Sequence, residues 1–133
     1  MGLNEISIER LKEITGYTNC SAEHEVVKRF WNVLEGFTNE ERIGYLRFVW
    51  GRTRLPLKEE ENVENHMIEV IEHWNTSMLP VGRTCFFRLQ LPPYENVKKL
   101  KTKLMYSIVH CRSIDADYDR AGAIVEEEQP SSA

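Results

Sequence analysis

Residues 79–94 read LPVGRTCFFRLQLPPY and join a turn-forming segment to an alternating apolar one. Pro80 and Gly82 interrupt regular structure just before a cysteine at position 85. After that cysteine, apolar side chains recur at every second position, which is the spacing of one strand face: Phe87, Leu89 and Leu91. We therefore expect Cys85 to lie in a loop that leads into a sheet, where a partner can reach its thiol.

The segments on either side of this stretch carry helical patterns. Apolar residues at helical spacing predict one helix from about 22 to 36 and another from about 95 to 111. Between them, Thr38-Asn39-Glu40-Glu41 forms a capping box that begins a further helix, and Gly51 is suited to end it. A short helix is expected after Ser7, followed by a turn at 16–19.

One segment is ambiguous. Residues 66–74 can line a helix, but their β-branched content also suits a strand, and we favour the strand. The acidic residues 58–65 are expected to form a surface loop. The predicted fold class is therefore α+β, with a small sheet containing the Cys85 strand and the helix at 95–111 packed on that sheet. Trp31 and Leu104 are expected to be buried.

Composition limits the function classes. The 133 residues suffice for one domain, and 41% hydrophobic with 29% charged residues is ordinary for a soluble globular protein. The net charge of -4 offers no basic footprint for nucleic acid, and the lysines at 98, 99, 101 and 103 fit a solvated helix face. No run approaches the roughly 18 apolar residues of a membrane span, and no signal peptide is visible. We expect a cytoplasmic or nuclear protein.

The cysteines are few and irregularly spaced. Cys20, Cys85 and Cys111 give an odd count, which favours free thiols over a disulfide framework. Cys111 completes the apolar face of its predicted helix, and Cys20 lies in a polar turn. A zinc site built from Cys20, His24, His110 and Cys111 has poor ligand spacing, and no cofactor is expected.

The stretch around Cys85 resembles the active-site motif of the HECT-type ubiquitin ligases. Nine positions match that motif: Leu79, Pro80, Thr84, Cys85, Phe86, Leu89, Leu91, Pro92 and Tyr94. The resemblance extends from about Ile6 to Asp117, and the run FVWGRTRLP at 48–56 is most similar to the large HERC-type members. Two positions depart from the pattern: Arg83 replaces the usual histidine, and Phe87 the usual asparagine.

The resemblance implies a division of the chain. Residues 1–15 would be the remnant of the last helix of a larger N-terminal lobe, and residues 16–20 the hinge between two lobes. Residues 21–118 would form the small C-terminal lobe, called the C-lobe below, and residues 119–133 a disordered acidic tail. The missing larger lobe would dock the ubiquitin-conjugating enzyme, E2.

The resemblance also implies a reaction and its residues. Cys85 would accept ubiquitin from an E2 as a thioester and pass it to a lysine of a protein substrate. Thr84 and Arg83 would support the thiol. The expected ubiquitin-binding positions are Leu79, Ser107 and Phe86. Because Phe86 and Phe87 alternate along the expected strand, one should be core and the other should lie near ubiquitin.

Two other readings remain open. A cysteine hydrolase would need a histidine, and His73 is nearest to Cys85 in sequence, but no glycine-rich oxyanion loop is visible. A module that binds ubiquitin or a substrate, with an incidental cysteine, is the alternative without catalysis. A thioester-trapping assay separates such a module from a ligase.

Overall fold

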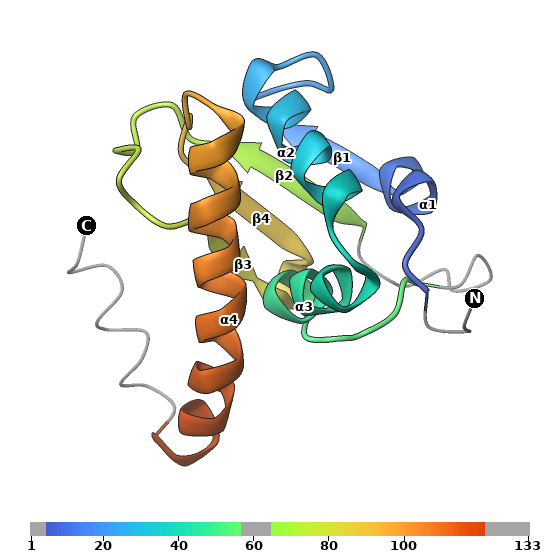
Figure 1. Ribbon diagram of the computed structural model, residues 1–133, viewed down its shortest axis with the longest axis vertical. Helices are drawn as coiled ribbons and strands as arrows, with labels where there is room; N and C mark the ends of the chain where they lie inside the picture. Colours follow the sequence, from blue (N-terminus) through green and yellow to red (C-terminus); the bar gives the residue numbers. More distant parts are fainter. Residues whose placement is uncertain (1–4, 57–64, 122–133) are drawn as a thin grey trace.

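The computed structural model describes residues 5–56 and 65–121 (Figure 1). It confirms the predicted α+β fold. The described elements are α1 (Ile8–Glu13), β1 (Thr15–Thr18), α2 (Glu25–Gly36), α3 (Asn39–Trp50), β2 (His66–Val70), β3 (Val81–Arg83), a 3-10 turn (Thr84–Phe86), β4 (Arg88–Leu91) and α4 (Val97–Ala121).

The four strands form one sheet in the order β1-β2-β4-β3. β1 and β2 are parallel, as are β2 and β4, while β3 pairs with β4 antiparallel. Parallel neighbours need a long crossover, and α2 and α3 lie within the connection from β1 to β2. The antiparallel pair needs only a short connection, and that connection contains Cys85.

The capping signals around α3 act as predicted. The Thr38 side chain accepts from the Glu41 amide at 3.1 Å, and the Glu41 carboxylate accepts from the Thr38 amide at 2.8 Å. At the other end, Gly51 takes the left-handed conformation with φ 77°. Both ends of α3 are therefore fixed, and its C-terminal end faces β3 and the 3-10 turn.

The last helix differs from its prediction in length and packing. It begins at Val97 and continues to Ala121, well past the predicted end near Cys111. It packs principally against α2 and α3 rather than on the sheet, because those two helices already contact β2, β3 and β4 (Figure 1). Leu100, Leu104 and Ile108 form its buried stripe, and Trp31 and Leu104 are buried as predicted.

The turn predicted at 16–19 is wrong, because residues 15–18 form β1. Thr15, Tyr17 and Thr18 are residue types that suit a strand, and the Tyr17 hydroxyl accepts from Trp31 Nε1 at 3.2 Å. The strand predicted at 66–74 is confirmed from His66 to Val70, beyond which the chain turns. The predicted loop at 58–65, apart from residue 65, and residues 122–133 lie outside the described residues.

The segment before β1 shares the core of the other elements. Ile6, Ile8 and Leu11 are buried. The Ile6 amide donates to Asn39 Oδ1 at 2.7 Å, and Arg42 Nη1 donates to the Ile6 carbonyl at 3.0 Å. α1 and β1 are thus packed on the remainder of the fold. The division into lobe remnant and hinge at 1–20 stays a prediction.

His66 is the buried polar residue at the centre of this packing. Its Nε2 is 2.6 Å from the Tyr45 hydroxyl, and its Nδ1 is 2.8 Å from Thr15 Oγ1. Thr15 Oγ1 in turn donates to the Leu11 carbonyl at 2.6 Å, so Nδ1 is the protonated nitrogen that donates to Thr15. Burial lowers the pKa of His66 from 6.5 to about 3, and the ring is therefore neutral.

Candidate functional site

Cys85 lies in the middle of the 3-10 turn between β3 and β4 and is exposed. Cys20 and Cys111 are both partly buried, and none of the three cysteines is paired in a disulfide. The expectation of a thiol on a loop leading into the sheet is confirmed. The strand that follows begins later than predicted: Phe86 and Phe87 precede it, and pairing with β3 starts only at Arg88.

The two phenylalanines after Cys85 point in different directions, but not by strand alternation. Phe86 is 59% exposed, whereas Phe87 is 0% exposed. Phe87 has φ 51°, in the left-handed region, and this reversal connects the 3-10 turn to β4. The division of the pair into one core and one surface residue is as predicted, but its cause is a backbone reversal.

The turn is held against the C-terminal end of α3. The ring of Phe87 stacks on Trp50, with centroids 4.3 Å apart and planes 8° from parallel. In β3, a Cβ on Gly82 would lie 2.2 Å from the Phe48 carbonyl oxygen, so only glycine permits this approach. Sequence reasoning missed both contacts. The only sequence signal was the glycine itself, which we interpreted as a turn residue.

Arg83 and Thr84 flank Cys85 without a hydrogen bond to its sulfur. Arg83 Nε donates to Gln90 Oε1 at 3.0 Å, and Gln90 Nε2 donates to Glu69 Oε1 at 3.0 Å. The Arg83 guanidinium is thus oriented along the sheet. Thr84 is exposed, and its hydroxyl makes no hydrogen bond to any residue that the structure describes.

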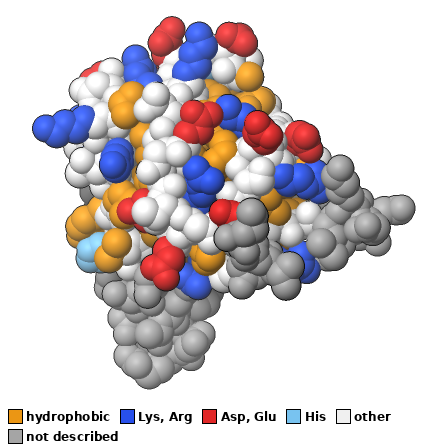
Figure 2. Space-filling view, turned by 45° about the vertical axis from the view of Figure 1, so that its right-hand side comes forward, with side chains coloured by type: hydrophobic (Ala, Val, Ile, Leu, Met, Phe, Trp, Pro, Cys, Tyr) orange, Lys and Arg blue, Asp and Glu red, His pale blue; other side chains and the backbone are white. Residues whose placement is uncertain are grey.

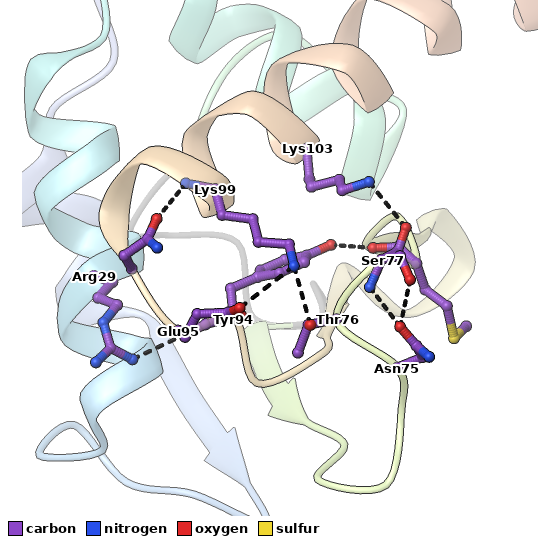
Figure 3. A network of polar contacts seen from close by, with 10 residues as sticks. Arg29, Asn75, Thr76, Ser77, Tyr94, Glu95, Lys99 and Lys103 are labelled. Carbon is purple, nitrogen blue, oxygen red and sulfur yellow. Dashed lines mark hydrogen bonds and ion pairs between the residues drawn. The ribbon is translucent and has the colours of Figure 1, made fainter.

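The loop between β2 and β3, which carries Leu79, is tied to the start of α4 (Figure 3). The Tyr94 hydroxyl donates to the Met78 carbonyl at 2.5 Å. Lys99 Nζ donates to Thr76 Oγ1 at 3.1 Å, and Lys103 Nζ donates to the Ser77 carbonyl at 2.9 Å. The interpretation of these two lysines as a merely solvated face is therefore wrong, because they hold the loop in place.

The predicted ubiquitin-binding positions differ in exposure. Leu79 is 38% exposed and Phe86 is 59% exposed, so a partner can touch both. Ser107 on α4 is only 6% exposed, and its hydroxyl has no hydrogen-bond partner among the described residues. A direct contact with Ser107 would require a neighbouring side chain to move.

On the face shown in Figure 2, basic and acidic side chains are interspersed. The described residues contain no group of three or more metal-binding side chains, and no described helix is long and apolar enough to cross a membrane. His73, the candidate base of a hydrolase, is exposed and makes no hydrogen bond within the described part of the chain.

Comparisons with known proteins agree on one family. Residues 1–116 match the HECT-domain (ubiquitin-transferase) family. The chain is 40% identical over 119 residues to E3 ubiquitin-protein ligase HERC2 of Mus musculus, covering 87% of this chain and 2% of that protein. It is 35% identical over 119 residues to E3 ubiquitin-protein ligase NEDD4 of Homo sapiens, covering 86% of this chain and 9% of that protein. The family match spans most of the chain, which therefore belongs to the HECT-domain family.

Proposed function

We propose that this chain is the catalytic C-lobe of a HECT-type E3 ubiquitin ligase and that Cys85 is its ubiquitin acceptor. The observation that carries the proposal is the placement of Cys85: it is the exposed thiol, on a turn fixed by the sheet and α3, within the family's motif. A nucleophile on a rigid, accessible turn suits transfer between proteins.

The reaction consists of two acyl transfers. In the first, the Cys85 thiolate attacks the thioester carbonyl between ubiquitin and the E2 cysteine. A carbon–sulfur bond to Cys85 forms, the bond to the E2 cysteine breaks, and that cysteine leaves as a thiolate. In the second transfer, a substrate lysine amine attacks the new thioester. An amide forms, Cys85 leaves as a thiolate, and the amine releases a proton to solvent.

Arg83 and Thr84 are proposed to support the negative charge that develops in both steps. Arg83 is always charged and cannot act as a general base. Because the guanidinium is exposed, we expect Arg83→Ala to slow alkylation of Cys85 by only about twofold to threefold, with the difference reduced by added salt. Alkylation rates that do not differ at low salt contradict a role for Arg83.

Leu79, Phe86 and Ser107 are proposed to contact ubiquitin. The exposure of Leu79 and Phe86 supports this for those two residues. The loop that carries Leu79 is held by α4, and the turn that carries Phe86 is held by the contact of Phe87 with Trp50. For Ser107, the proposal rests on its unpaired hydroxyl and on the resemblance.

The larger protein is also a proposal. The chain spans only 2% of the HERC2 proteins and 9% of NEDD4. We propose that a preceding lobe recruits the E2 and that residues 16–20 contain the hinge to that lobe. Protein substrates would be modified in the cytoplasm or nucleus, where free thiols such as these remain reduced.

The test is thioester trapping in the full-length ligase with E1, E2, ATP and labelled ubiquitin. The wild type should give an adduct that a thiol reductant removes. Cys85→Ser should give an oxyester that resists the reductant, and Cys20→Ser should behave as the wild type. A reductant-sensitive adduct that persists in Cys85→Ser contradicts the assignment. Ubiquitin binding without any adduct favours the binding module instead.

A further inference from the structure

We infer that Trp50 and Phe87 are positioning residues, whose stacked rings set the direction in which Cys85 presents its sulfur. This inference rests on the proposed function, because it concerns the same thiol. Neither side chain is exposed enough to bind a partner: Phe87 is 0% exposed, and Trp50 is 8% exposed. Their influence would act through the backbone of the Cys85 turn.

The backbone at Phe87 is one that its side chain does not favour. Asn19 and Phe87 are the two non-glycine residues with positive φ in the described part of the chain. Asparagine adopts the left-handed region readily, but phenylalanine does not, because its Cβ comes too close to the following carbonyl oxygen in that region. Local preference therefore works against this turn, so contacts elsewhere must hold it.

The contacts that hold it come from α3 and β2. The Phe87 ring lies against Trp50 at 4.3 Å, and the Arg52 guanidinium lies 4.6 Å from the centroid of the Trp50 ring. The Phe87 carbonyl accepts from the Met67 amide at 2.9 Å. The ring and the carbonyl of Phe87 are thus both fixed, and its φ and ψ cannot relax toward the extended values of an ordinary strand.

This arrangement bears on Cys85 because only Phe86 separates it from the reversal. A change in the backbone angles of Phe87 would swing the 3-10 turn relative to β4. Transfer between two large proteins requires the sulfur to meet a carbonyl held by the other protein, and a displacement of about 1 Å can cost about a hundredfold in rate. A small reagent can approach from many directions and is insensitive to such a displacement.

The experiment compares two reactions of Cys85 in the full-length ligase. One is transfer of ubiquitin from a loaded E2, and the other is alkylation by iodoacetamide. Trp50→Leu removes the aromatic ring but keeps an apolar side chain, whereas Trp50→Phe keeps a ring. We expect Trp50→Leu to slow transfer by about tenfold or more while changing alkylation by less than about twofold, and Trp50→Phe to retain most of the transfer rate.

Two controls separate positioning from stability. Leu104→Ala weakens the core on α4, away from the turn, and should leave transfer unchanged at a temperature where the variant is folded. Phe87→Leu removes the ring on the other side and should repeat the pattern of Trp50→Leu, so the test does not depend on one variant. Circular dichroism establishes that each variant is folded in the assay.

The outcomes distinguish the two proposals. If the wild type transfers ubiquitin normally and neither Trp50→Leu nor Phe87→Leu slows the transfer, the positioning role alone is overturned. Equal slowing of transfer and alkylation, or slowing by Leu104→Ala as well, also overturns it, because either points to a general loss of structure. A wild-type ligase that forms no adduct on Cys85 overturns the proposed function itself.

Discussion

Gly82 lies in β3, where that strand passes the C-terminal end of α3. Its φ is not positive, so the requirement is for space rather than for backbone freedom. A Cβ there would lie 2.2 Å from the Phe48 carbonyl oxygen and 3.3 Å from Val49 Cα. These are backbone atoms of a capped helix, and they cannot move aside as a flexible side chain can.

Gly82→Ala should therefore destabilise the fold. We expect the free energy of unfolding to fall by about 1–3 kcal/mol, the usual cost of forcing extra atoms into a packed site. Gly36→Ala is the matched control: nothing lies within 4 Å of its Cβ, and replacing this glycine should leave the stability unchanged or raise it by up to about 1 kcal/mol. Urea titration measures the free energy of unfolding of both variants. Equal effects of the two substitutions contradict the close approach of Gly82 to the Phe48 carbonyl.

The residues of the Cys85 turn show where sequence reasoning succeeds and where it stops. A proline and a glycine that interrupt regular structure, followed by alternating apolar residues, were enough to predict that the thiol lies on an accessible loop. It was not enough to find the reversal at Phe87, because phenylalanine has a strand preference and the opposing contact comes from Trp50, which is distant in sequence. Local patterns do not contain such pairings.

Whole elements also divide into those that local sequence patterns predict and those that depend on distant contacts. α2 and α3 were predictable, since each has its own periodicity and α3 also has caps at both ends. β1 was not, because its four residues carry too little pattern, and its strand conformation depends on pairing with β2. The spacing of the lysines on α4 predicts a solvated helix face. In the fold, however, the loop at 75–78 lies close enough to accept hydrogen bonds from Lys99 and Lys103.

The buried face of α4 offers a test at this scale. Leu104 is fully buried and lies on the side that packs against α2 and α3. Leu104→Ala should lower the free energy of unfolding by about 2–5 kcal/mol, through lost apolar burial and the cavity that remains. Val109→Ala, on the same helix at 55% exposure, should change it by less than about 0.5 kcal/mol.

Denaturant titration of the two variants gives the comparison directly. Similar small effects for both would mean that α4 is not held by its Leu100, Leu104 and Ile108 stripe. Similar large effects for both would mean that the face of α4 that carries Val109 is also buried against other residues.

Across the whole molecule, His66 connects elements that are far apart in sequence. Tyr45 on α3, His66 on β2 and Thr15 on β1 form one chain of hydrogen bonds that ends at the Leu11 carbonyl of α1. Every member needs its partner, because an unpaired buried polar group is costly. The cluster therefore ties the segment at 8–18 to the remaining core, and it connects the proposed lobe remnant, through Leu11 and Thr15, with the proposed C-lobe.

This cluster predicts how the stability of the whole molecule depends on pH. Burial holds the pKa of His66 at about 3, whereas the unfolded residue has its ordinary value of 6.5. Between these two values, the unfolded state binds a proton that the folded state does not, so stability falls as the pH falls. One pKa unit corresponds to about 1.4 kcal/mol, and going from pH 7.5 to pH 5.5 should therefore remove about 1.4 kcal/mol through this group alone.

Urea titrations at several pH values between 7.5 and 5.5 measure this loss. In His66→Gln the titrating ring is gone, so the drop in stability over this range should shrink by about 1.4 kcal/mol even if the variant is less stable at every pH. Val109→Ala changes an exposed side chain that carries no titrating group, and it should keep the pH dependence of the wild type. If His66→Gln retains the full wild-type drop, His66 is not buried in its neutral form, and the hydrogen-bonded link from α1 to α3 must be abandoned with it.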